Sequence, residues 1–274
     1  MKECIGNSSS PEESQCESKE FPSETLFYRE YEEFYKMAAE SDVFGQFCRK
    51  AFGADFSQDG FSDIGQVDRI LKYIPDGGQA HILDIGCGNG KMLAYLQERT
   101  GAFIHGFDYS NRAVTSAKKR YPQKSDFRQG VMGEINYPEE TFDLIVSMDT
   151  MYFAADMTAF TGQLWSWLKK GGTFFCAYQE GDVMPKTENV HTTKLAEALR
   201  AQGIAFETKD ITKECYELLL RKREAAVSLK DSFFEAGEGA WYQMLIGQTE
   251  YAEKPFEAFR GEMARYLFVA KKAG

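Results

Sequence analysis

Three glycines at alternate positions, Gly86, Gly88 and Gly90, form a loop whose chemistry suits a polar ligand. Glycine lacks a Cβ atom and tolerates positive φ, so a ligand can lie directly against the backbone of such a turn. Two carboxylates accompany it: Asp84 lies two residues before Gly86, and Asp108 ends the next apolar run. A carboxylate at the tip of a second strand can accept hydrogen bonds from both hydroxyls of a ribose. The pattern therefore predicts a nucleotide-type ligand.

A strand and a helix must hold this turn in place. The apolar run 81–83 is long enough for a buried strand, and apolar side chains recur at helical spacing over residues 92–96. The helix N-terminus then offers free N–H groups to electron-rich parts of a ligand. The dinucleotide fingerprint has the spacing Gly-x-Gly-x-x-Gly, whereas the third glycine here comes one residue earlier. The spacing therefore disfavours NAD.

The arrangement Asp-x-Gly-x-Gly-x-Gly over residues 84–90, with Asp108 after the next strand, resembles motif I of the class I S-adenosylmethionine (SAM) dependent methyltransferases. The resemblance implies SAM as the cofactor and S-adenosylhomocysteine as the product. Asp108 would bind the ribose diol, and Tyr109 would lie along the adenine. Asp84 has two open roles, a water-mediated contact to the amino group of SAM or support of the turn through N–H bonds. The cofactor-binding residues implied in this way are Asp84, Gly86, Cys87, Gly88, Gly90, Asp108, Tyr109, Val131, Met132 and Met148.

The chain departs from the family at the adenine site. The family usually has an acidic residue after the third strand, which contacts the adenine amino group. Residues 130–134 have no aspartate in the expected place. We expect backbone atoms of Val131 and Met132 to make this contact instead.

Strand and helix patterns alternate from residue 80, which predicts an α/β fold with a mainly parallel sheet covered on both faces. The resemblance implies a Rossmann-like sheet of seven strands whose last two form a hairpin, so that the seventh is antiparallel. A turn at Gly171-Gly172 is expected before the fifth strand. The predicted strands are 81–83, 102–108, 126–129, 142–148, 173–178, 205–211 and 265–271.

Five parts of the chain are predicted from composition and pattern. Serines that can cap helices, Ser23, Ser41 and Ser62, mark the starts of three helices before the first strand. The predicted parts are a mobile tail (1–22), an N-terminal helical cap (23–75), the SAM-binding core (76–211), a helical insertion or lid (212–262) and a final core strand (263–274).

The tip of the fourth strand, residues 147–153, would lie below the reactive methyl group in the resembled family. Asp149 and Tyr152 are the candidates to assist proton removal from an acceptor, and capping of the next helix is an equally weighted role for Asp149. The tip lacks the Asn-Pro-Pro-Tyr, Asp-Pro-Pro-Tyr and Pro-Cys motifs of nucleic-acid methylation. The candidate substrate-binding residues are Tyr28, Tyr35, Tyr178 and Trp241. For each of these residues that lies in a helix, the alternative is a place on an aromatic helix face that packs against the core.

Composition restricts the partners of the 274-residue chain. Its 32 basic and 42 acidic residues give a net charge of −10, which repels phosphate backbones, so no nucleic-acid partner is expected. No apolar run is long enough to span a membrane, and the N-terminus has no apolar signal region, so we expect a cytoplasmic protein. Six scattered cysteines predict no disulfide framework, and three histidines without metal-ligand spacing predict no metal. No pattern predicts the oligomeric state.

The sequence thus favours a SAM-dependent methyltransferase that acts on a small-molecule acceptor, with amines slightly ahead of hydroxyl groups. Aromatic faces and carboxylates near the strand tips both favour positive charge. A non-catalytic SAM-binding or regulatory protein is the alternative from another class. An NAD-dependent oxidoreductase is less favoured, because the glycine spacing differs.

Overall fold

The computed structural model describes residues 27–57 and 60–274. The predicted tail, the Ser23 cap, Cys4 and Cys16 lie outside these residues. A seven-stranded sheet with the order β3-β2-β1-β4-β5-β7-β6 forms the centre of the molecule. Strands β1 to β5 pair in parallel, and β7 pairs antiparallel with both β5 and β6, so the predicted fold class is confirmed. The strands are β1 (His81–Ile85), β2 (Phe103–Asp108), β3 (Ser125–Gln129), β4 (Phe142–Met148), β5 (Leu168–Glu180), β6 (Glu207–Asp210) and β7 (Ala264–Lys271).

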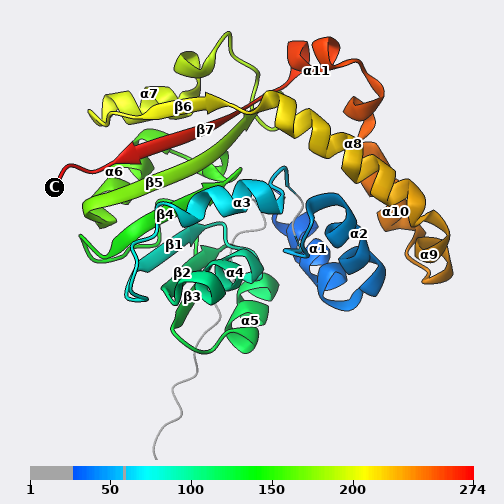
Figure 1. Ribbon diagram of the computed structural model, residues 1–274, viewed down its shortest axis with the longest axis horizontal. Helices are drawn as coiled ribbons and strands as arrows, with labels where there is room; N and C mark the ends of the chain where they lie inside the picture. Colours follow the sequence, from blue (N-terminus) through cyan, green and yellow to red (C-terminus); the bar gives the residue numbers. More distant parts are fainter. Residues whose placement is uncertain (1–26, 58–59) are drawn as a thin grey trace, which may run out of the picture.

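Helices cover both faces of this sheet (Figure 1). On one face, apolar residues of α3, α4 and α5 share a core with β1, β2 and β4; on the other, α6 and α7 pack around the buried Trp167. The central strands are apolar on both sides because both faces are covered. The helices are α1 (Tyr28–Glu40), α2 (Asp42–Phe52), α3 (Ile64–Leu71), α4 (Lys91–Thr100), α5 (Asn111–Arg120), α6 (Met157–Trp167), α7 (Lys194–Ala201), α8 (Thr212–Ser228), α9 (Lys230–Glu235), α10 (Gly239–Gln248) and α11 (Phe256–Glu262), with 3-10 turns at Met151–Phe153, Val190–Thr192 and Glu250–Glu253.

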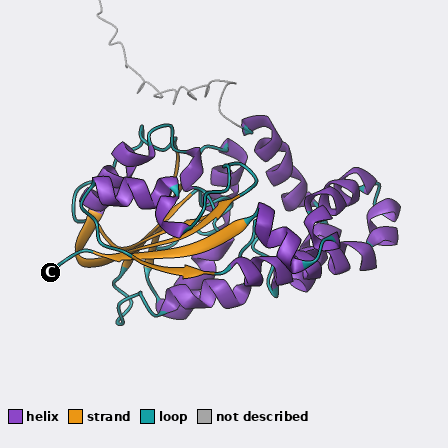
Figure 2. Ribbon diagram, turned by 90° about the horizontal axis from the view of Figure 1, so that it is seen from above, coloured by secondary structure: helices purple, strands orange, loops and turns teal. Residues whose placement is uncertain are grey.

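A separate helical layer lies beside the sheet, as Figures 1 and 2 show. Helices α1 and α2 pack there against α8, α9 and α10 in a core that includes Phe34, Phe44 and Leu218. The N-terminal cap and the late insertion, far apart in sequence, therefore form one helical unit. Helix α3, by contrast, packs on the sheet, although it was predicted within the cap. The domain boundaries remain predictions.

Two local predictions need correction. Ser41 caps α2 as predicted, but α3 is capped by Asp63, because the hydroxyl of Ser62 instead accepts a hydrogen bond from Arg265. Strand β5 begins at Leu168, directly after α6, so the predicted Gly171-Gly172 turn lies inside the strand. An irregularity in the pairing of β4 with β5 accommodates these glycines.

Three further observations concern only residues 27–57 and 60–274. None of their helices combines the length and apolar character needed to cross a bilayer. No cluster of three or more histidine, cysteine or acidic side chains in these ranges is arranged to hold a metal ion. The cysteines of this part of the chain, at positions 48, 87, 176 and 215, are buried and form no disulfide.

Candidate active site

The glycine turn connects β1 to α4 at the carboxyl edge of the sheet. All three glycines have positive φ, 72° at Gly86, 53° at Gly88 and 76° at Gly90, a region that other residues rarely adopt. The N–H groups of Gly86 and Cys87 donate to the carbonyl of Phe107 at 2.9 and 3.0 Å. These bonds tie the turn to the end of β2 and bring it beside Asp108.

Asp108 is the buried carboxylate of this crevice, with 4% of its surface exposed. It accepts hydrogen bonds from the backbone N–H groups of Gly88 and Ser110, both at 2.9 Å. Burial raises the pKa of Asp108 to about 6, and the two N–H donors offset only part of this effect. Burial, with the nearby charge of Asp108 as a smaller cause, also raises the pKa of Asp84 well above its ordinary value.

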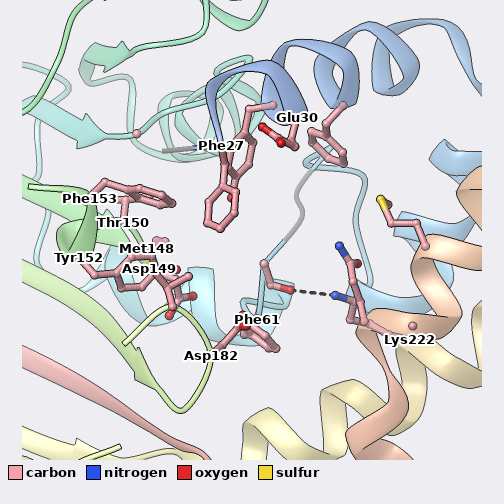
Figure 3. Close-up of a pocket in the computed structure, with 18 of the residues that line it drawn as sticks. Phe27, Glu30, Phe61, Met148, Asp149, Thr150, Tyr152, Phe153, Asp182 and Lys222 are labelled. Carbon is pink, nitrogen blue, oxygen red and sulfur yellow. Dashed lines mark hydrogen bonds between the residues drawn. The ribbon is translucent and has the colours of Figure 1, made fainter. Parts of the chain in front are cut away.

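A cavity of about 870 Å³ adjoins the turn. Gly86, Met148 and Thr150 line it on the side of the sheet, and Trp241 and Lys222 line it on the side of α10 and α8. Figure 3 shows Phe27, the residue before α1, pointing into this space, where its ring lies 6.5 Å from that of Phe153 at the tip of β4. The cavity thus lies between the carboxyl edge of the sheet and the helical layer, where ligands bind in open α/β sheets.

The tip of β4 is fixed to the glycine turn by Thr150. The Thr150 hydroxyl donates to the carbonyl of Ile85 at 2.7 Å and lies 2.7 Å from the hydroxyl of Ser147. A Cβ atom at Gly86 would lie 2.6 Å from the Thr150 methyl group, so the two strand ends pack closely only because residue 86 is glycine.

Asp149, next to Thr150, forms a buried ion pair with Arg265 of β7. The guanidinium donates from Nε to Oδ1 at 2.9 Å and from Nη2 to Oδ2 at 2.7 Å. The side chains of Arg265 and Asp149 are 0% and 5% exposed. This bidentate pair occupies both carboxylate oxygens, so the Asp149 side chain is held in a fixed position beside the cavity.

Residues 83–176 match a family described as a methyltransferase domain. The chain is 26% identical over 236 residues to phosphoethanolamine N-methyltransferase 3 of Arabidopsis thaliana, with 78% of this chain and 47% of the relative covered. It is 25% identical over 177 residues to the sterol 24-C-methyltransferase ERG6A of Gibberella zeae, with 60% and 43% covered. The chain thus spans about half the length of these curated relatives.

A solved structure of phosphoethanolamine N-methyltransferase 2 from Haemonchus contortus, in complex with phosphomonomethylethanolamine and S-adenosylhomocysteine, shares the fold. Its TM-score is 0.70 at 18% identity, and the match covers 89% of this chain and 60% of that one. The methyltransferase domain over residues 83–176 and the shared fold support the class I SAM-dependent methyltransferase family that the glycine motif indicated.

The structure brings several predicted site residues together. Tyr35 and Trp241, predicted as substrate-binding, both line the cavity, as do Asp149 and Tyr152 at the tip of β4. Tyr109 lies beside them in an aromatic cluster, with its ring 6.3 Å from that of Phe153. On the side of the cofactor crevice, Gly86 and Met148 line the same cavity.

Other predicted residues lie elsewhere. Tyr178 is completely buried in the core, with its ring 6.2 Å from Phe268, because its β5 position faces the covered side of the sheet. Tyr28 packs edge-on against Tyr109, outside the lining of the cavity. Val131 and Met132 follow β3, on the far side of β2 from β1, and do not line the cavity either.

The predicted capping role of Asp149 is wrong, because α6 is capped by Asp156 and the Asp149 carboxylate is paired with Arg265. Sequence analysis missed Arg265. Tyr31, on the aromatic face predicted for the first helix, contacts the rings of both Tyr109 and Phe153. A signal for Arg265 was present, since it is a lone charge inside the apolar stretch 263–270. Such a charge is rarely buried unless it is paired.

Proposed function

We propose that this methyltransferase binds SAM in the crevice between the glycine turn and Asp108, and transfers its methyl group to a small molecule in the adjoining cavity. The observation that carries the proposal is the continuity of the two spaces. Gly86 and Met148, both expected at the cofactor, also line the 870 Å³ cavity. A cofactor in the crevice would therefore present its reactive end to the cavity.

The residues of the crevice fit this cofactor. Each oxygen of Asp108 accepts one backbone N–H and keeps acceptor capacity for a ribose hydroxyl. The three glycines of the turn beside it have no side chains of their own, and the Tyr35 side chain lies against Gly88 in this structure. SAM, when bound, supplies a sulfonium methyl group that a nucleophile can accept while the electron pair of the broken S–C bond stays on sulfur.

The protein itself contributes position and exclusion of water. Thr150 holds the tip of β4 on the glycine turn, and the Asp149–Arg265 pair fixes the next residue of the tip. The aromatic rings of Tyr31, Tyr152 and Phe153 enclose this end of the cavity. Alignment of a nucleophile with a fixed electrophile is the main requirement of such a transfer.

An amine is the acceptor that we favour. Ring faces favour cations, and the carboxylates of Glu30, Glu33 and Asp182 also line the cavity. The name of the Arabidopsis thaliana relative, which refers to an amine, supports the same class. The ammonium form of an amine must lose a proton before its nitrogen can attack the methyl group, and Asp149, paired with Arg265, is not placed as a free base for this step. Hydroxyl acceptors remain the second candidate because tyrosine hydroxyls also line the cavity.

Release of S-adenosylhomocysteine from SAM tests the proposal directly. We would assay the protein with phosphoethanolamine, ethanolamine, sarcosine, catechol and palmitic acid, and with SAM alone as the blank. Turnover with one of the three amines above the blank is expected. Turnover confined to catechol or palmitic acid would refute the amine class and keep the methyltransferase activity. Binding of S-adenosylhomocysteine without turnover of any acceptor would favour a non-catalytic SAM-binding protein.

A further inference from the structure

Arg265 has more partners than an ordinary structural arginine. Its guanidinium carries five N–H groups, and five acceptors from two separate segments of the chain surround it. They are the two carboxylate oxygens of Asp149, the carbonyl of Phe61, the hydroxyl of Ser62 at 2.7 Å and Oε1 of Gln66 at 2.6 Å. The side chain is completely buried.

These partners belong to two segments that meet at one end of the cavity. Asp149 belongs to the tip of β4, whereas Phe61 belongs to the segment that leads into α3. Both residues line the cavity, and Arg265 itself does not. Figure 3 shows Asp149 and Phe61 at the same end of this space. A single guanidinium behind the wall therefore sets the distance between two parts of that wall.

The geometry of Asp149 depends on this contact. Asp149 has φ 60°, in the left-handed region that is uncommon for residues other than glycine. Its backbone N–H donates to the carbonyl of Ala177 at 3.0 Å, and the guanidinium fork holds its side chain. The planar guanidinium donates two parallel hydrogen bonds to a carboxylate, which a lysine ammonium group cannot do.

We infer that Arg265 is a positioning residue for the methyl transfer, an inference that rests on the proposed function. It holds the Asp149 carboxylate and the backbone at Phe61 in fixed places, and these define where the acceptor lies relative to the methyl group. Because Arg265 lies behind the wall, it acts on the placement of the acceptor and not on the affinity for SAM.

Conservative replacement separates this role from a purely structural one. Arg265→Lys keeps the positive charge and loses the paired hydrogen bonds of the guanidinium. Misplacement of reacting groups by about 1 Å lowers the reaction rate about 100-fold. We expect kcat/KM for the best acceptor of the panel to fall by about that factor, while calorimetry gives an unchanged affinity for S-adenosylhomocysteine. Arg260→Lys is the matched control, because Arg260 is exposed on α11 and should leave both values unchanged.

Chemical rescue provides the second readout. Arg265→Ala leaves a space of the size of the lost group, and guanidinium chloride at millimolar concentration should restore at least part of the lost kcat, whereas urea and sodium chloride should not. Thermal melting shows whether each variant is folded, and Arg265→Lys decides the matter if the alanine variant does not fold. Parental kcat/KM in Arg265→Lys, or no guanidinium rescue of a folded Arg265→Ala, would overturn the inference alone. A parent protein without turnover on any acceptor would overturn the proposed function, and this inference with it.

Discussion

The Tyr35 side chain of α1 lies against the backbone of Gly88, where a Cβ atom built on the glycine would overlap the tyrosine hydroxyl. Helix α1 therefore closes the crevice at the centre of the glycine turn. A cofactor can lie on Gly88 only after the Tyr35 ring has moved. This contact relates the N-terminal helix directly to cofactor entry, in line with the predicted cap.

Truncation of Tyr35 should ease cofactor entry. If the form in which the Tyr35 ring has moved away from Gly88 is a minor state, its population limits the apparent affinity for the cofactor and the rate of cofactor association. We expect Tyr35→Ala to accelerate association of S-adenosylhomocysteine by about tenfold, with Tyr35→Phe between the parent and the alanine variant. Stopped-flow fluorescence would measure the rates. Slower association in the alanine variant would show that Tyr35 supports the cofactor instead of blocking it.

A second prediction concerns Glu32, which fastens α1 to α5. Its carboxylate accepts from the Ser110 hydroxyl at 2.6 Å and lies 3.4 Å from Nε of Arg112. Because Glu32→Ala removes these contacts, the backbone amides of α1 should exchange their hydrogens faster. Cleavage of α1 by an added protease should also become faster. S-adenosylhomocysteine should slow the cleavage in the parent, because water exclusion favours a closed cap over the cofactor.

The matched control for Glu32 is Glu40→Ala, at the exposed end of the same helix. Hydrogen exchange followed by mass spectrometry would compare the variants. Equal exchange of α1 in the parent and in Glu32→Ala would contradict a fastening role for this carboxylate.

Asp108 should make cofactor binding pH-dependent. Its pKa is raised from 3.8 to about 6 in the folded protein, mainly by burial. The ionised carboxylate, which accepts two hydroxyl hydrogen bonds, therefore forms as the pH rises through 6. We expect the affinity for S-adenosylhomocysteine to increase from pH 5 to pH 7 in the parent. Asp108→Asn should bind at least tenfold more weakly at pH 7, since hydrogen bonds to charged groups contribute about 1.5–3 kcal/mol each.

The same pKa shift predicts the effect of Asp108 on stability in the absence of cofactor. An acid whose pKa is raised on folding stabilises the fold below its unfolded value of 3.8, and this stabilisation is lost as the pH rises to about 6. Asp108→Asn should therefore melt at a higher temperature than the parent at pH 7, by an amount corresponding to roughly 2–3 kcal/mol. Melting curves at pH 4 and pH 7 would test this. A lower melting temperature of the variant at pH 7 would contradict it.

The local parts of this structure could be predicted from the sequence. The glycine turn, the carboxylate of Asp108 and the continuous strand 142–148 depend on neighbouring residues, and each lies where it was expected. Helix caps were less certain, because Ser62 and Asp63 are both good caps and only the contact with Arg265 decides between them.

The acceptor side of the site could not be predicted in the same way. The Asp149–Arg265 pair joins residues 116 positions apart, and no local pattern connects them. Tyr178 and Trp241 are both aromatic, but burial inside the sheet or exposure to the cavity depends on which face each element presents after folding. Residue type alone therefore indicated an aromatic site and two of its members, Tyr35 and Trp241, but could not separate them from Tyr178, which is buried in the core.

Calorimetric titration with S-adenosylhomocysteine tests the central claim most directly. The parent should bind one ligand with micromolar-range affinity, and neither NAD nor ATP should compete. Gly88→Val should abolish binding while its circular dichroism stays that of a folded protein, because the side chain would fill the ligand space and φ 53° disfavours a β-branched residue. No detectable binding to the parent, displacement by NAD, or unchanged affinity in folded Gly88→Val would contradict the assignment of the crevice to SAM.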